Sequence, residues 1–122
     1  MANDIRILYV DDEQELRFLV DTQLTNEGFF VETADDGDTA IKMMEKNSYD
    51  VILLDIRMPR VNGIEVLKYI KKQRINSRVI MLTAVDDLSV ALEAVKTGAI
   101  DYLTKPYEFE TLLKAILRVV VK

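Results

Sequence analysis

The chain has 122 residues, enough for one ordinary domain and too few for two, and its net charge is -5. Hydrophobic residues make up 49% and charged residues 30%, which predicts a packed core under a solvated surface. The acidic balance argues against direct nucleic-acid binding by this domain. The absence of cysteine and histidine excludes disulfides, zinc sites built on those residues and catalysis through a histidine base.

The start of the chain does not resemble a signal peptide, and no apolar run approaches the length of a membrane span. We therefore expect a cytoplasmic protein with no membrane partner.

Short β-rich runs alternate with amphipathic segments along the whole chain. The predicted strands cover 5–10, 29–34, 51–55, 79–82 and 99–103. The predicted helices place Leu16, Leu19, Val20 and Leu24 inward in the first, Ala40, Ile41 and Met44 in the second, Ile64, Leu67 and Ile70 in the third, Leu88, Ala91, Leu92 and Val95 in the fourth, and Phe109, Leu112, Leu113 and Ile116 in the last.

This alternation predicts an α/β fold, a doubly wound five-stranded parallel sheet with helices on both faces. The strand order 2-1-3-4-5 of the flavodoxin-like type fits it. We see no linker or internal repeat, so residues 1–122 are expected to form one domain.

Polar side chains stand at the carboxyl ends of these strands: Asp11 and Asp12 after the first, Asp55 at the third, Thr83 after the fourth and Lys105 after the fifth. Parallel strands share one carboxyl edge, and the first and third strands are neighbours in this order. We therefore expect these groups to converge around Asp55.

Three carboxylates brought together repel one another, so one must be protonated or a cation must join them. Oxygen ligands without histidine or cysteine favour Mg²⁺. The cation would also mask the charge of Asp55, which could then act as a nucleophile and form an aspartyl phosphate. Lys105 could pair with one phosphoryl oxygen and Thr83 could hydrogen-bond another.

These residues resemble a response-regulator receiver domain of the chemotaxis-regulator type over essentially the whole chain. The matching motifs are Asp11-Asp12, the Leu-Asp-Ile-Arg-Met-Pro run at 54–59, Thr83-Ala84, and the Tyr-Leu-Thr-Lys-Pro run at 102–106. The resemblance implies a two-component response regulator in which a sensor histidine kinase or phosphotransfer protein phosphorylates Asp55. It implies a signalling domain that catalyses only its own phosphorylation and dephosphorylation, not an enzyme.

The same resemblance implies roles for the other residues at the strand ends. Asp11, Asp12, Asp55 and the backbone carbonyl of Arg57 are implied ligands of Mg²⁺. Lys105 is implied to contact the phosphoryl group.

Thr83 and Tyr102 are the implied switch residues: Thr83 moves towards the phosphoryl group and Tyr102 turns inward behind it. This movement reshapes the face formed by the fourth helix, fifth strand and fifth helix. The Lys105–Pro106 peptide bond is expected to be cis. This face would control a partner or an output domain beyond Lys122, or pair two phosphorylated copies. Apolar residues expected off the core face there are Val90, Ala94, Leu117 and Val121.

Other interpretations remain open. A degenerate receiver could dock partners without phosphorylation. A flavin or nucleotide binder would need a phosphate loop after the first strand, where the acidic 11–13 segment would repel phosphate. An aspartyl-phosphate hydrolase would need an acid where Arg57 stands. Taken singly, Asp12 could cap a helix with Glu15 in a capping box, and Lys105 could be an ordinary loop lysine.

Overall fold

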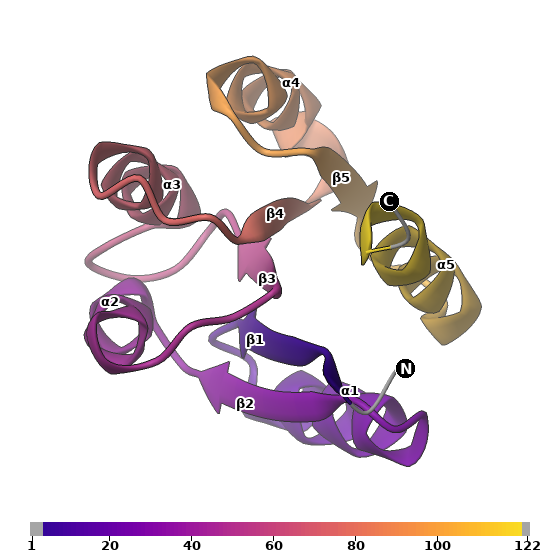
Figure 1. The fold of residues 1–122 in the computed structure, drawn as a ribbon. Coiled ribbons are helices and arrows are strands. Elements are labelled where there is room, and N and C mark those ends of the chain that lie inside the picture. Colours follow the sequence, from indigo (N-terminus) through magenta and orange to yellow (C-terminus); the bar gives the residue numbers. More distant parts are fainter. Residues whose placement is uncertain (1–3, 121–122) are drawn as a thin grey trace.

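A computed structural model describes residues 4–120, and strands alternate with helices throughout (Figure 1). The strands are β1 (Arg6–Val10), β2 (Phe30–Ala34), β3 (Val51–Asp55), β4 (Arg78–Thr83) and β5 (Asp101–Thr104). The helices are α1 (Gln14–Asn26), α2 (Gly37–Lys46), α3 (Gly63–Lys72), α4 (Leu88–Thr97) and α5 (Phe109–Val120), with a short 3₁₀ turn (Val85–Asp87) before α4.

The strands form one sheet in the order β2-β1-β3-β4-β5, and every neighbouring pair is parallel. The predicted fold class and strand order are therefore confirmed. Val10 pairs with Leu54 and Asp55 pairs with Leu82, so the central strands end close to the same level. Within residues 4–120, no helix is both long and apolar enough to cross a membrane.

Helices cover both faces of the sheet: α1 and α5 lie on one side, and α2, α3 and α4 lie on the other (Figure 1). Successive strand residues alternate between these two cores. Leu53 packs with residues of α1 and α5, while its neighbours Ile52 and Leu54 pack with residues of α2, α3 and α4. Every residue of β3 is buried, which holds the strand that carries Asp55 from both sides.

The inward face predicted for α4 is wrong in part. Leu88 and Leu92 are 40% and 49% exposed, whereas Ala94, which was expected off the core face, is 2% exposed. Apolar residues surround most of this helix, so their spacing does not single out one face. The small side chains of Ala91 and Ala94 face the sheet and are buried in the core.

For apolar residues on the other helix positions, the observed exposure agrees with the predicted face in some cases and not in others. On α1, Leu19 was predicted to face the core but is 50% exposed. Val90 and Leu117 are 37% and 39% exposed, in line with their expected position off the core face. Val121 lies outside the described residues.

The start of α3 packs directly on the backbone of the central strand. Asn62 accepts a hydrogen bond from the Glu65 amide, and the Glu65 carboxylate accepts one from the Asn62 amide, which completes a capping box. A Cβ atom on Gly63 would lie 2.2 Å from the carbonyl oxygen of Asp55 and 2.9 Å from Cα of Ile56. Only glycine permits this approach, so the α3 N-terminus helps to hold Asp55 in place.

Gly63→Ala should therefore destabilise the fold by roughly 1–3 kcal/mol or more, because the new methyl group meets backbone atoms that cannot rotate away. Urea unfolding monitored by circular dichroism measures this change. Lys68→Ala, an exposed substitution on the same helix, is the matched control and should leave the midpoint nearly unchanged. Equal midpoints for Gly63→Ala and wild type would contradict the close approach.

Candidate functional site

Asp11 anchors the site, and its side chain is fully buried at the end of β1. Its Oδ1 accepts a hydrogen bond from the Glu13 amide at 2.9 Å. Its Oδ2 accepts one from Nζ of Lys105 at 2.8 Å and one from the Tyr9 hydroxyl at 3.1 Å. On α1, Arg17 donates to the Asp11 carbonyl oxygen at 2.8 Å. Both the carboxylate and the backbone of Asp11 are thus held in one orientation.

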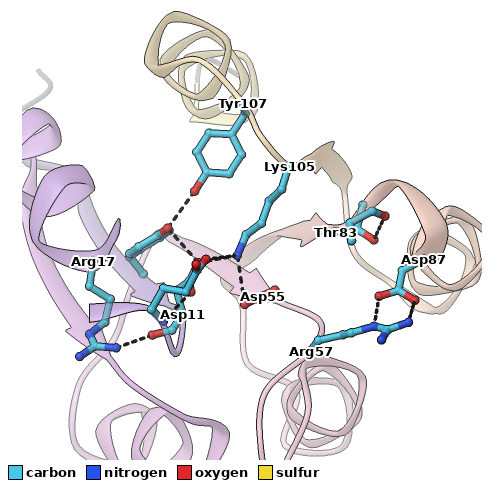
Figure 2. Close-up of polar contacts among 11 residues, drawn as sticks. Asp11, Arg17, Asp55, Arg57, Thr83, Asp87, Lys105 and Tyr107 are labelled. Atoms are coloured by element: carbon cyan, nitrogen blue, oxygen red, sulfur yellow. Dashed lines mark hydrogen bonds and ion pairs between the residues drawn. The ribbon is translucent and has the colours of Figure 1, made fainter. Parts of the chain in front are cut away.

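Lys105 connects the end of β5 to the acids at the ends of β1 and β3 (Figure 2). Besides its contact with Asp11, Nζ lies 3.2 Å from Oδ2 of Asp55 and 3.4 Å from Oε1 of Glu13. Its backbone amide donates to the Thr83 carbonyl oxygen at 2.7 Å, which aligns the loop with β4. The Lys105–Pro106 peptide bond is cis, as expected.

Asp11, Asp12 and Asp55 form a compact acidic cluster. One carboxylate oxygen from each lies within 4.8 Å of the others. Asp11 and Asp55 are buried, while Asp12 is exposed at the rim. An all-oxygen donor set of this size fits Mg²⁺, which takes one or two carboxylates and keeps several water ligands. The predicted convergence of the three acids with Lys105 is therefore present in the structure.

The electrostatics follow from this crowding. Burial first, and then the charge of Asp11, raise the pKa of Asp55 to about 6, although Lys105 opposes the change. Burial alone would lower the pKa of Lys105, but its hydrogen bonds and charge contacts with Asp11 and Asp55 raise it above its usual value. The ammonium thus remains charged and partly neutralises the acids.

Thr83 is the last residue of β4, and Tyr102 lies within β5. Among the described residues, neither side chain forms a hydrogen bond with Asp55. The Thr83 side chain is buried, and its hydroxyl donates to the Ala84 carbonyl oxygen at 3.0 Å (Figure 2). Tyr102 is half-buried against the core formed with α2, α3 and α4. Their switch roles stay predictions.

The capping alternative for Asp12 does not match the structure. The N-cap residue of α1 is Glu13, and its side chain makes no capping hydrogen bond. Asp12 is instead one of the three clustered acids.

Sequence reasoning missed a bidentate ion pair between Arg57, two residues after Asp55, and Asp87 at the N-cap of α4. Nε of Arg57 lies 2.5 Å from Oδ2 of Asp87, and Nη2 lies 2.7 Å from Oδ1 (Figure 2). Asp87 makes no capping bond to its own helix. The pair therefore ties the loop after β3 to the start of α4, and no local sequence pattern links two residues this far apart.

Sequence reasoning also missed two tyrosine hydroxyls beside the acids. Tyr9 lies two residues before Asp11, and Tyr107 lies two residues after Lys105. Their hydroxyl oxygens are 2.8 Å apart. Burial raises the pKa of Tyr107 to about 12 and also raises that of Tyr9, so both hydroxyls keep their protons near neutral pH. The alternation of side chains along β1, which turns Tyr9 and Asp11 the same way, was an available signal.

Asp55 should make the free energy of unfolding depend on pH in the absence of divalent cations. Its pKa is about 6 in the fold against an ordinary value of 3.8, so between these values the folded state holds a proton that the unfolded chain releases. Its contribution to the free energy of unfolding therefore falls as the pH rises through that window.

The measurement is urea unfolding of wild type and Asp55→Asn in chelator. From about pH 4 to about pH 7, the stability of Asp55→Asn relative to wild type should rise by about 2–3 kcal/mol. Glu45→Gln, which removes an exposed carboxyl on α2, is the control and should show no comparable rise. A difference for Asp55→Asn that stays constant with pH would contradict the raised pKa.

Loss of the ion pair between Arg57 and Asp87 should loosen the start of α4. We expect Arg57→Gln to speed amide hydrogen exchange there by about two- to fivefold, a modest effect because the Arg57 side chain is 69% exposed. Exchange read by mass spectrometry over peptides from 84–92 measures it. Arg118→Gln, which removes the exposed contact with Asp101, is the matched control. Unchanged exchange in Arg57→Gln would show that the pair does not restrain α4.

Comparison with known proteins agrees with this geometry. A family model described as the response regulator receiver domain matches residues 7–117. The alkaline phosphatase synthesis transcriptional regulatory protein PhoP of Bacillus subtilis is 40% identical over 116 residues, covering 93% of this chain and 48% of that protein. The regulatory protein AtoC of Escherichia coli is 38% identical over 107 residues, covering 88% of this chain and 23% of that protein. The chain thus spans about half, or less, of these curated relatives.

Solved structures give the same result. The receiver domain of the Francisella response regulator 1452 superposes with a TM-score of 0.86 at 37% identity, covering 96% of this chain and 94% of that chain. The Vibrio cholerae chemotaxis protein CheY4 superposes with a TM-score of 0.88 at 36% identity, covering 94% of this chain and 98% of that chain. The resemblance drawn from the sequence is confirmed, and the chain belongs to the response regulator receiver domain family of two-component signalling.

Proposed function

We propose that this receiver domain switches by accepting a phosphoryl group on Asp55 in a Mg²⁺-dependent reaction. The observation that carries the proposal is the contact of one ammonium, Nζ of Lys105, with two acids, at 2.8 Å from Asp11 and 3.2 Å from Asp55. Positioning and charge neutralisation supply most of what phosphoryl transfer needs. Residues 1–122 would act together as one receiver unit.

The reaction joins an Asp55 carboxylate oxygen to phosphorus while the bond from phosphorus to the donor breaks. With a pKa of about 6, Asp55 is mostly ionised at neutral pH and carries the lone pair that this attack needs. A bound Mg²⁺ would offset the charge of the clustered acids, so that an anionic phosphoryl group could approach. Asp11, Asp12, Asp55 and the Arg57 carbonyl are its proposed ligands.

Lys105 would pair with a phosphoryl oxygen, since its flexible ammonium already lies beside Asp55. Thr83 would supply a hydroxyl to a second oxygen, and Tyr102 would follow its movement. The domain would thereby catalyse only its own phosphorylation and dephosphorylation.

The proposed donor is a sensor histidine kinase or a phosphotransfer protein, acting in the cytoplasm. The curated relatives include transcriptional regulatory proteins longer than this chain, which supports control of an output domain as one consequence of phosphorylation. The face formed by α4, β5 and α5 would transmit the change or pair two copies. Exposed Val90 and Leu117 support that assignment, whereas buried Ala94 does not.

The proposal predicts that acetyl phosphate and Mg²⁺ add one phosphoryl group to wild type and none to Asp55→Asn, because the amide cannot act as the nucleophile. Intact-mass spectrometry measures the addition. Asp50→Asn is the matched control, since Asp50 stands at the opposite end of β3, where its carboxylate accepts a hydrogen bond from the Arg6 amide. This variant should be labelled like wild type, and chelation of Mg²⁺ should prevent labelling.

Equal labelling of Asp55→Asn and wild type would contradict Asp55 as the acceptor. The alternative is a degenerate receiver that docks partners without phosphorylation. Failure of wild type both to bind Mg²⁺ and to become labelled would favour that alternative.

A further inference from the structure

A chain of two tyrosine hydroxyl groups leads from the loop after β5 to the acidic cluster. Tyr9 on β1 is fully buried, and Tyr107 is half-buried at the beginning of the segment before α5. The Tyr9 hydroxyl lies 2.8 Å from the Tyr107 hydroxyl and 3.1 Å from Oδ2 of Asp11. Figure 2 shows Tyr107 pointing from the α5 side towards Asp11, which follows β1.

The direction of these hydrogen bonds follows from the number of protons. The Asp11 carboxylate can only accept, so the single hydroxyl hydrogen of Tyr9 is donated to it. In the contact between the tyrosines, Tyr107 must therefore donate and Tyr9 must accept. Donation to the Tyr9 oxygen polarises its O–H bond and strengthens the bond to Asp11. The chain runs from Tyr107 through Tyr9 to Asp11.

Two residues of the loop after β5, Lys105 and Tyr107, are connected to the same carboxylate oxygen, Oδ2 of Asp11. Nζ of Lys105 donates a hydrogen bond to it directly, whereas Tyr107 is connected to it through the hydroxyl of Tyr9. If Lys105 turns to a phosphoryl group, as the proposed function requires, the hydroxyl of Tyr9 and the amide of Glu13 are the donors that still orient Asp11. A carboxylate with 0% exposure needs such donors to keep one orientation.

We propose that Tyr9 and Tyr107 are positioning residues that orient Asp11 for cation binding, with Tyr107 acting through Tyr9. This inference rests on the proposed function, because it takes Asp11 as part of the Mg²⁺ site. Partners that orient a metal-binding carboxylate contribute to affinity without touching the ion.

Calorimetric titration with Mg²⁺ alone, without a phosphoryl donor, tests the inference. Tyr9→Phe should raise the dissociation constant roughly tenfold, the lower end for loss of an orienting partner. Tyr107→Phe should raise it by roughly two- to threefold, because it weakens the remaining bond rather than removing it. Tyr49→Phe is the matched control. The Tyr49 hydroxyl donates to Glu32 at 2.5 Å and makes no hydrogen bond to the acidic cluster in the described part of the chain, so the affinity of this variant for Mg²⁺ should be unchanged.

The double variant separates a connected chain from two independent effects. Once Tyr9 lacks its hydroxyl, Tyr107 has no route to Asp11, so Tyr9→Phe with Tyr107→Phe should match Tyr9→Phe alone. Additive losses would overturn the directed chain. Unchanged or tighter Mg²⁺ binding in both single variants would overturn the positioning role, as would an equal loss in Tyr49→Phe.

Two further measurements keep the test decisive. Urea unfolding of each variant establishes that the protein titrated is folded, and if Tyr9→Phe does not fold, unchanged affinity in Tyr107→Phe alone overturns the proposal. Phosphoryl labelling of wild type separates this inference from the proposed function. Labelled wild type with normal Mg²⁺ affinity in the tyrosine variants refutes only the inference, whereas wild type that neither binds Mg²⁺ nor becomes labelled refutes both.

Discussion

The structure depends on holding mutually repelling carboxylates together at one edge of a parallel sheet. Asp11 and Asp55 are buried, and with Asp12 they place oxygens within 4.8 Å of one another. Burial and like charge both oppose ionisation, which is why the pKa of Asp55 rises. Lys105 offsets part of this repulsion because its ammonium contacts both buried acids. An arrangement that costs stability in this way is typical of sites kept for chemistry.

Rigid backbone contacts keep these charges in place. β3 is buried on both faces, and the α3 N-terminus approaches the Asp55 carbonyl so closely that a Cβ atom on Gly63 would lie 2.2 Å from it. On the other side, the Lys105 amide donates to the Thr83 carbonyl oxygen at 2.7 Å. The site therefore does not rely on side-chain attraction alone. The fold holds the acids close without a cation, so less ordering would remain for the binding of one.

The sequence predicted the fold and the gathering of the acids because both follow from local patterns. Parallel strands bring their carboxyl ends to one edge, so residues that follow strands, such as Asp55 and Lys105, could be placed without knowing any contact. The face of α4 could not be predicted, since Leu92 and Ala94 both satisfy an apolar spacing and only packing against the sheet decides that alanine faces inward. The contact between Arg57 and Asp87 could not be predicted from the sequence either, because it depends on how two loops face each other.

The two connections that the sequence did not predict differ in how readily charge can disturb them. The pair between Arg57 and Asp87 lies at the surface, with the arginine side chain 69% exposed, so solvent screening weakens it. The contact from Tyr9 to Asp11 is buried, where a lost hydrogen bond cannot be replaced by bulk water.

If Asp55 is phosphorylated as proposed, the phosphoryl dianion would add negative charge two residues from Arg57. It would then compete with Asp87 for the Arg57 guanidinium. The weaker connection would then be lost first, which would direct the structural change towards α4 while β1 and the acids that follow it stay in place. On this proposal, the difference in burial between the two connections would separate the part of the domain that holds the cation from the part that responds to phosphorylation.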